Sequence, residues 1–333
     1  MVMNTVQIIS GSKRIDYVDH LKGFAILLVV MSHVIGKTLG YDHIFLLNVI
    51  TSFYMPLFMF LSGLCCRKKN NLLYNIIKKM KRLLVPFVLF GLLRCFFINE
   101  NWIHLFDTEL KVGYWFLFVL FVIFVIFVIY YFLQGIFILL KIKNFKTEII
   151  AYFITFIMLY GLKYILPSMV SSYLSMGLIA GMFPFFVLGV LVAQYEKMMH
   201  LITNDKMYTL SLFLAVICFY YFYYVSSSML FLVPLKFCMV IVVFNFFRLN
   251  SDKWIIGKYL QFWGGKSLNI YVIHYYFLLY IPFWGNWIQV ENNQLYTPLL
   301  LVAVLFLSVI IIVCTLILDK ILCTSSFINK YIL

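Results

Sequence analysis

Apolar stretches of about 17 to 25 residues recur along the chain, and they limit what it can fold into more than any other feature. Each stretch is long enough for a helix to cross a hydrocarbon core of ~30 Å, and the ~10-residue alternating pattern of outer-membrane barrel strands is missing. Because 65% of the 333 residues are hydrophobic and 11% are charged, this apolar surface cannot be hidden inside a water-soluble globule. The sequence predicts an all-α, polytopic membrane helix bundle.

About ten transmembrane helices are expected. Their ranges are 21–39, 44–66, 83–99, 113–140, 148–165, 173–194, 208–226, 229–247, 267–287 and 297–319. Only "SSS" at 226–228 separates the seventh span from the eighth, so nine or eleven spans are alternatives. We expect one membrane domain over residues 1–333, without a secretory leader: a cytoplasmic segment 1–20, a bundle 21–319 and a cytoplasmic tail 320–333.

Basic residues indicate the orientation, because cytoplasmic loops are enriched in Lys and Arg. With the N-terminus in the cytoplasm, 21 of the 26 basic residues and seven of the 12 acidic residues fall on the cytoplasmic side, which places the whole excess of +14 there. The loop and helix start "CCRKKNNLLYNIIKKMKRLLVP" carries the densest group of cations. Two interpretations stay open for this group: topology with lipid contact, or a specific site for a polyphosphate.

The first span contains a lysine and a histidine, Lys22 and His33, and polar groups are costly in hydrocarbon. They are eleven residues apart, which places both on one face of a helix, three turns and ~16 Å apart. A lone histidine in a membrane helix is often only a hydrogen-bond partner for another helix. A lysine at the cytoplasmic end of the same face indicates the second possibility, a route from the cytosol to a functional histidine.

Several motifs, taken in order, resemble those of the acyltransferase 3 family. The family's first motif is a basic residue followed, after ten other residues, by a histidine. The segment "RIDYVDHLKGFAILLVVMSHV" resembles it, with Lys22 as the basic residue, His33 as the histidine and Asp19 as the aspartate that precedes them. "PLFMFLSGLCCRKK" resembles the Ser-Gly element at Ser62, and "KKMKRLLVP" resembles the paired basic motif. "GYWFLFVLF", "FPFFVLGVL" and "GGKSLNIYVIHYYF" resemble later landmarks. The likeness covers residues 14–280, although Lys22 stands where many members have arginine.

The resemblance implies an integral membrane O-acyltransferase, in a bacterial inner membrane, that moves an acyl group, expected to be acetyl, from cytosolic acetyl-CoA to a hydroxyl of an extracytoplasmic sugar. The implied partners are acyl-CoA, a carbohydrate or glycolipid acceptor and the lipid bilayer, with no nucleic acid and no bound cofactor. Catalysis falls on His33 and Lys22. Acyl-CoA contacts fall on the following residues: Lys79, Arg82, Ser62, Ser267 and His274.

The chemistry needs a base, because an alcohol is a poor nucleophile until its proton is removed. His33, kept neutral by burial, suits that role, and a covalent acyl-histidine is the alternative. Asp19 cannot orient His33, because fourteen helical residues span ~21 Å; it is expected to cap the helix or to pair with Lys22. For His274, contact with the acyl donor and a structural hydrogen bond are equally expected roles. For Ser62, we expect a role in close helix packing and not a role as a nucleophile.

Two other functions are alternatives. A transporter or flippase for a lipid-linked sugar, with His33 as proton relay, explains the composition equally well but not the ordered motifs. A membrane-bound O-acyltransferase of the unrelated protein- or lipid-modifying type ranks lower. No His or Cys pair has metal-ligand spacing, so no metal site is expected. Two histidines, His43 and His104, are expected on the outer face. We interpret them as ordinary polar loop residues in preference to sugar contacts.

Overall fold

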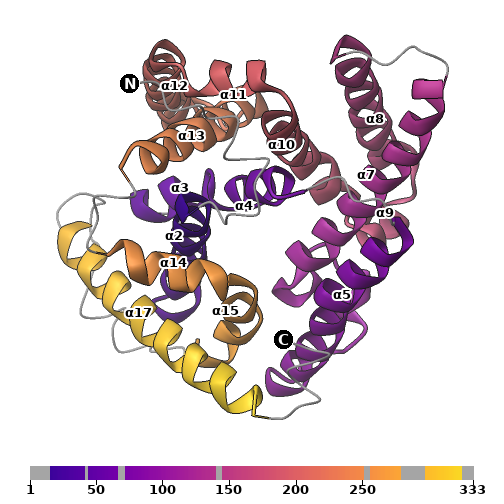
Figure 1. Ribbon diagram of the computed structural model, residues 1–333. Coiled ribbons are helices and arrows are strands. Elements are labelled where there is room, and N and C mark those ends of the chain that lie inside the picture. The colour runs from indigo at the N-terminus through magenta and orange to yellow at the C-terminus, as the bar shows by residue number, and fades with distance from the viewer. Residues whose placement is uncertain are drawn as a thin grey trace. The chain divides into compact units, whose positions relative to one another are not determined.

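The computed structural model describes residues 16–41, 44–66, 72–139, 145–250, 256–278 and 297–324 (Figure 1). Every regular element within these ranges is a helix, which confirms the all-α prediction. Among the described residues, seven helical segments are long and apolar enough to cross a membrane, so the protein is a multi-pass membrane protein. They are Tyr17–Thr38, Phe45–Leu64, Thr147–Ile165, Met176–Gln194, Asp205–Val225, Met229–Asn250 and Pro298–Leu322. The count of about ten and the cytoplasmic position of both termini stay predictions.

The chain falls into two compact units, and each is described by itself. Unit 1 comprises Met1–Cys65 and Leu188–Lys320, and unit 2 comprises Cys66–Val187 and Ile321–Leu333. Unit 1 holds α2 (Asp16–His33), η1 (Val34–Thr38), α3 (Phe45–Thr51), α4 (Tyr54–Leu64), α11 (Glu196–Thr203), α12 (Asp205–Tyr220), η3 (Tyr221–Val225), α13 (Met229–Asn250), α14 (Gly257–Gly265), α15 (Ser267–Ile273), η5 (His274–Phe277) and nearly all of α17 (Thr297–Leu322). Unit 2 holds α5 (Leu72–Phe97), α6 (His104–Asp107), η2 (Lys111–Gly113), α7 (Trp115–Leu139), α8 (Phe145–Ile165) and α9 (Ser168–Leu174), and α10 (Met176–Gln194) runs through the boundary. The single domain expected over residues 1–333 stays a prediction.

Helix α2 is the central helix of unit 1. Within its apolar span 78% of the residues are buried, against 17% for the span formed by α12 and η3. Helices α4, α13, α14 and α15 contact α2, and Figure 1 shows α14 crossing it. A helix that is apolar on all sides is stable only when it is surrounded, and in unit 1 other helices surround it. The polar side chains of Asp19, His20 and Ser32 lie inside the unit, whereas Lys22 and His33 are half-buried.

Two glycines let α14 approach α2 closely. A Cβ atom at Gly23 would collide with the carbonyl of Leu260, and a Cβ atom at Gly264 would collide with the carbonyl of Asp19. Small residues are the usual means by which membrane helices bring their backbones together. This contact fixes the end of α14, and with it the start of α15, against the first turn of α2.

Two expected spans are broken in the structure. The span 44–66 divides into α3 and α4, because Phe53 leaves the helical region of backbone angles (φ −144°, ψ −17°). Pro56 explains the position of the break, since a proline clashes with the carbonyl four residues earlier, here that of Ser52. The span 267–287 is an α-helix only as far as Ile273 and continues as a 3₁₀ turn to Phe277; residues 279–287 lie outside the described ranges.

Candidate active site

His33 is the last residue of α2, and the chain continues directly into the π-helical turn η1. The turn is closed by a hydrogen bond from the amide of Leu39 to the carbonyl of Val34 at 2.9 Å. Single π-turns are rare within helices and occur often at functional sites. The continuous helix from Asp16 to His33 confirms that Lys22 and His33 share one helix, ~16 Å apart along its axis.

Two rings from η5 pack against the imidazole of His33. The hydroxyl of Tyr275 lies 2.9 Å from Nε2 of His33, and their ring centroids are 4.8 Å apart. The ring of His274 stacks on that of His33 with centroids 5.3 Å apart, and it lies 4.2 Å from the ring of Tyr275. The structure thus brings together His33 and His274, two residues that the motifs singled out and that are separated by most of the chain.

Tyr275 was not among the predicted site residues. Its only sequence signal is its place directly after His274, and spacing along the chain does not show which residue of "HYYF" reaches α2. The hydrogen bond to His33 is also what the structural interpretation of a lone membrane histidine expects. Geometry alone therefore fits both roles that were considered for His33.

His274 is fully buried, and its Nδ1 lies 3.0 Å from the carbonyl oxygen of Ile270. Because a carbonyl can only accept, Nδ1 of His274 carries the proton in this contact. In the neutral ring the lone pair then lies on Nε2. The backbone contact agrees with the structural half of the prediction for His274, while contact with an acyl donor stays a prediction.

Lys22 forms an ion pair with Asp19, with Nζ 3.6 Å from the carboxylate oxygen. Asp19 lies in the first turn of α2 and is buried, whereas the side chain of Lys22 is 27% exposed. This confirms that Asp19 pairs with Lys22 and does not orient His33. The carboxylate of Asp19 therefore holds the ammonium of Lys22, whose side chain is partly exposed.

The paired basic motif lies on α5, in unit 2. The ammonium of Lys79 sits 5.3 Å from the ring centroid of Phe124 on α7, and Arg82 is exposed. The two side chains therefore differ in surroundings: Lys79 is held against an aromatic face and Arg82 reaches outward. Lys22 belongs to unit 1, so a phosphate site shared by these three cations stays a prediction.

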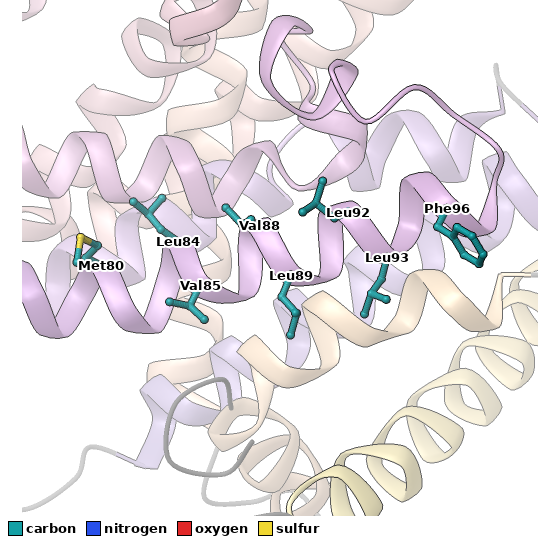
Figure 2. A pocket seen from close by; sticks show the side chains of 8 residues that line it. All are labelled: Met80, Leu84, Val85, Val88, Leu89, Leu92, Leu93 and Phe96. Atoms are coloured by element: carbon teal, nitrogen blue, oxygen red, sulfur yellow. The ribbon is translucent and has the colours of Figure 1, made fainter. Parts of the chain in front are cut away.

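Further along α5, a groove of about 640 Å³ is lined by apolar side chains (Figure 2). Its lining residues are Met80, Leu84, Val85, Val88, Leu89, Leu92, Leu93 and Phe96. These side chains cannot donate a hydrogen bond or carry charge, so they cannot hold a phosphate or activate a hydroxyl. The groove therefore contributes no group to the chemistry.

Ser62 lies in α4, where another helix approaches closely. A Cβ atom at Gly189 of α10 would collide with the carbonyl of Phe60, and it would lie 2.7 Å from the amide nitrogen of Leu64. Ser62 is half-buried on the turn between these two contacts. This supports close packing as the role of the Ser-Gly element, as predicted, and acyl-CoA contact at Ser62 stays a prediction.

Ser267 begins α15, beside a buried polar cluster that the sequence did not indicate. The carboxylate of Asp319, on α17, accepts from Nδ2 of Asn269 at 2.6 Å and pairs with Nζ of Lys266 at 2.9 Å. Asp319 is buried and Lys266 is 40% exposed. The cluster ties α17 to the segment that carries Ser267 and His274. It could not be found from spacing, because Asp319 lies 50 or more residues from its two partners.

The outer-loop candidates interact mainly with each other. Nδ1 of His104 lies 3.1 Å from Asp107 and Nε2 lies 3.6 Å from Glu100, which supports loop polarity as their role. His43 lies outside the described residues. Within the described ranges, no three His, Cys, Asp or Glu side chains gather as metal ligands would.

The fold is that of a multi-pass membrane helix bundle, and a half-buried histidine of its central helix α2 stacks on the buried His274. The sequence model of the acyltransferase 3 family, described as an acyltransferase domain, matches residues 15–317. The chain therefore belongs to the acyltransferase 3 family and is a membrane acyltransferase. Neither the curated proteins nor the solved structures gave a match to the chain.

Proposed function

We propose that this protein is an O-acyltransferase that moves an acyl group, acetyl in the first instance, from cytosolic acyl-CoA to a hydroxyl of an extracytoplasmic sugar or polysaccharide. The proposed location is a bacterial inner membrane, with the cationic face toward the cytosol. One observation carries the proposal: His33 and His274, from motifs at opposite ends of the matched region, stack at 5.3 Å inside unit 1.

The reaction requires removal of a proton from the acceptor hydroxyl. In the proposed step, a nitrogen of His33 takes that proton while the hydroxyl oxygen attacks the thioester carbonyl. The carbon–sulfur bond then breaks, and the leaving thiolate takes the proton from His33. Atoms and charge balance without a metal or redox partner. Base catalysis of this kind contributes ~10²- to 10⁴-fold.

A covalent variant uses the same residue. His33 would attack the thioester first, and the acyl-histidine would then pass its acyl group to the acceptor. The two routes differ in one observable: the covalent route lets labelled acyl-CoA transfer label to the protein when acceptor is absent. His33→Ala removes both routes.

Cationic side chains are the proposed binding groups for the phosphates of acyl-CoA. Lys22 stands at the far end of α2 from His33, with its side chain partly exposed and its ammonium beside Asp19. Lys79 and Arg82 are the proposed phosphate contacts of unit 2, since cationic side chains hold phosphates by charge-assisted hydrogen bonds. Ser62, Ser267 and His274 keep the donor-contact role that the family resemblance implies.

The test measures transfer of radiolabelled acetyl from acetyl-CoA to glycan in membranes that carry equal amounts of protein. The variants are His33→Ala and Lys22→Ala, and His200→Ala is the matched control because His200 is an exposed histidine of α11. We expect label in glycan with the wild type and with His200→Ala, and loss of at least 100-fold with His33→Ala.

Two results would contradict the proposal. Full transfer by His33→Ala would remove the base from the mechanism. Equal label with and without the protein, over a panel of bacterial glycans, would show that the proposed donor and acceptor are wrong.

A further inference from the structure

Tyr275 makes a direct polar contact to the His33 imidazole, and no motif assigned it a role. Its ring is buried, and its hydroxyl lies 2.9 Å from Nε2 of His33. The two residues come from elements 242 positions apart, so the contact is a product of the tertiary fold. A hydrogen bond of this length between the buried Tyr275 and the half-buried His33 fixes both the rotation of the imidazole and the use of one of its nitrogens.

The chemistry of the two groups sets the direction of the bond. A phenol hydroxyl is more acidic than the N–H of a neutral imidazole, so Tyr275 donates and Nε2 of His33 accepts. The lone pair of the neutral ring is then the one that faces the tyrosine, and Nδ1 carries the proton. Tyr275 therefore selects the tautomer of His33 that has its lone pair on Nε2, and in the proposed reaction the acceptor hydroxyl takes the place of the tyrosine hydroxyl at that nitrogen.

A cation lies over the tyrosine ring. Nζ of Lys37 is 5.5 Å from the ring centroid of Tyr275, and Lys37 is exposed. Lys37 belongs to η1, the π-turn that follows His33, so one short segment supplies both the imidazole and the cation. A positive charge on the ring face withdraws electron density and makes the hydroxyl a stronger donor.

We propose that Tyr275 is a positioning residue for His33, that its hydroxyl donates to Nε2 and holds the imidazole in one tautomer and orientation, and that Lys37 acts through the Tyr275 ring. The catalytic consequence rests on the proposed function of His33. The contact itself does not, and this difference allows the two to be tested separately.

The first experiment compares Tyr275→Phe with Tyr276→Phe. Tyr275→Phe keeps the ring and removes only the hydroxyl, while Tyr276→Phe removes a hydroxyl from the next, half-buried residue of the same 3₁₀ turn. We expect Tyr275→Phe to lower kcat about 10-fold or more, with little change in KM for acetyl-CoA or acceptor, and Tyr276→Phe to resemble the wild type. A rise in KM for the acceptor with kcat unchanged would overturn the proposal and make Tyr275 a substrate contact.

The second experiment needs no transferase activity. Diethyl pyrocarbonate reacts with the unprotonated nitrogen of histidine, and mass spectrometry of the digested protein locates the modified residue. With Nε2 of His33 released, we expect faster modification of His33 in Tyr275→Phe than in the wild type or in Tyr276→Phe. An unchanged rate would overturn the proposed contact. Faster modification in a protein that transfers no acyl group would keep the contact and reject the proposed function.

The role of Lys37 is tested by a double-mutant cycle. Lys37→Gln should lower kcat in the wild type, Lys37→Arg should retain it, and Lys37→Gln should add no further loss to Tyr275→Phe, because the hydroxyl through which it acts is already gone. Additive losses would overturn the indirect role of Lys37.

Discussion

Lys111 is the clearest case in which this structure predicts a measurable pH dependence. It is 1% exposed, and its ammonium donates to the backbone carbonyls of Phe106, Ser172 (3.3 Å) and Tyr173 (2.8 Å). These carbonyls end α6 and α9, where helices leave their last carbonyls without partners. Three N–H groups meet three acceptors, so one lysine closes two helix ends within unit 2.

The backbone at this point is shaped around the same contact. Lys111, Val112 and Gly113 all have positive φ, at 49°, 52° and 98°. Positive φ is costly for a β-branched residue such as Val112, at about 1 to 3 kcal/mol. The surrounding contacts of Lys111 are what offset that cost.

Burial lowers the pKa of Lys111 from 10.5 to about 8, while the carboxylates of Asp107 and Glu109 act in the opposite direction. Below pH 8 both the folded and the unfolded chain hold the proton, so this group contributes no pH dependence. Between pH 8 and 10.5 the unfolded chain still holds a proton that the folded chain has released, so folding stability rises with pH. At ~1.4 kcal/mol for each pH unit, the full rise is about 3 kcal/mol.

The assay is a reversible unfolding titration in detergent between pH 7.5 and 10.5, on the wild type, Lys111→Met and the exposed-lysine control Lys206→Met. Tyrosines and cysteines titrate in the same range, so the quantity of interest is the difference between the wild type and each variant. We expect the wild type to gain about 3 kcal/mol relative to Lys111→Met across this range, and nothing relative to Lys206→Met. Parallel curves for the wild type and Lys111→Met would refute the argument.

Two further predictions concern unit 1. Gly264→Leu should lower the unfolding free energy by about 3 kcal/mol, because the new side chain meets the carbonyl of Asp19. The control is Gly161→Ala, which should be neutral or stabilising because a Cβ atom there has nothing within 4 Å. Equal effects of the two variants in a thermal melt would contradict this prediction. Lys266→Met should cost about 3 kcal/mol, because it leaves the carboxylate of Asp319 buried without its cation. Asp319→Asn should cost nearer 1 kcal/mol, because Lys266 is 40% exposed and reaches water; the reverse order in the same melts would show that burial does not control the pair.

The sequence by itself determined the class of protein and the content of its helices. Long apolar stretches lie in the bilayer, where backbone groups cannot bond to water, and a helix satisfies these groups within a single segment. Local geometry also fixed the relations within α2: the distance from Lys22 to His33 and the pairing of Asp19 with Lys22 follow from the rise and turn of one helix. The ordered motifs likewise sufficed to predict the family.

Breaks within the expected spans were only partly readable. Pro56 carries a signal for the break between α3 and α4, because its clash with the preceding turn is local. The change from α15 to a 3₁₀ turn at His274 carries no comparable signal, and an apolar window cannot register it, since the composition does not change at that residue.

Only the tertiary structure decided which polar groups meet. Tyr275 reaches His33, and Asp319 reaches Lys266, across 242 and more than 50 positions of sequence. Hydrophobic periodicity states which face of a helix is buried, but not which residue of another helix faces it. That choice depends on where two helices cross, and in unit 1 the crossing of α2 and α14 is set by the close approach at Gly23 and Gly264.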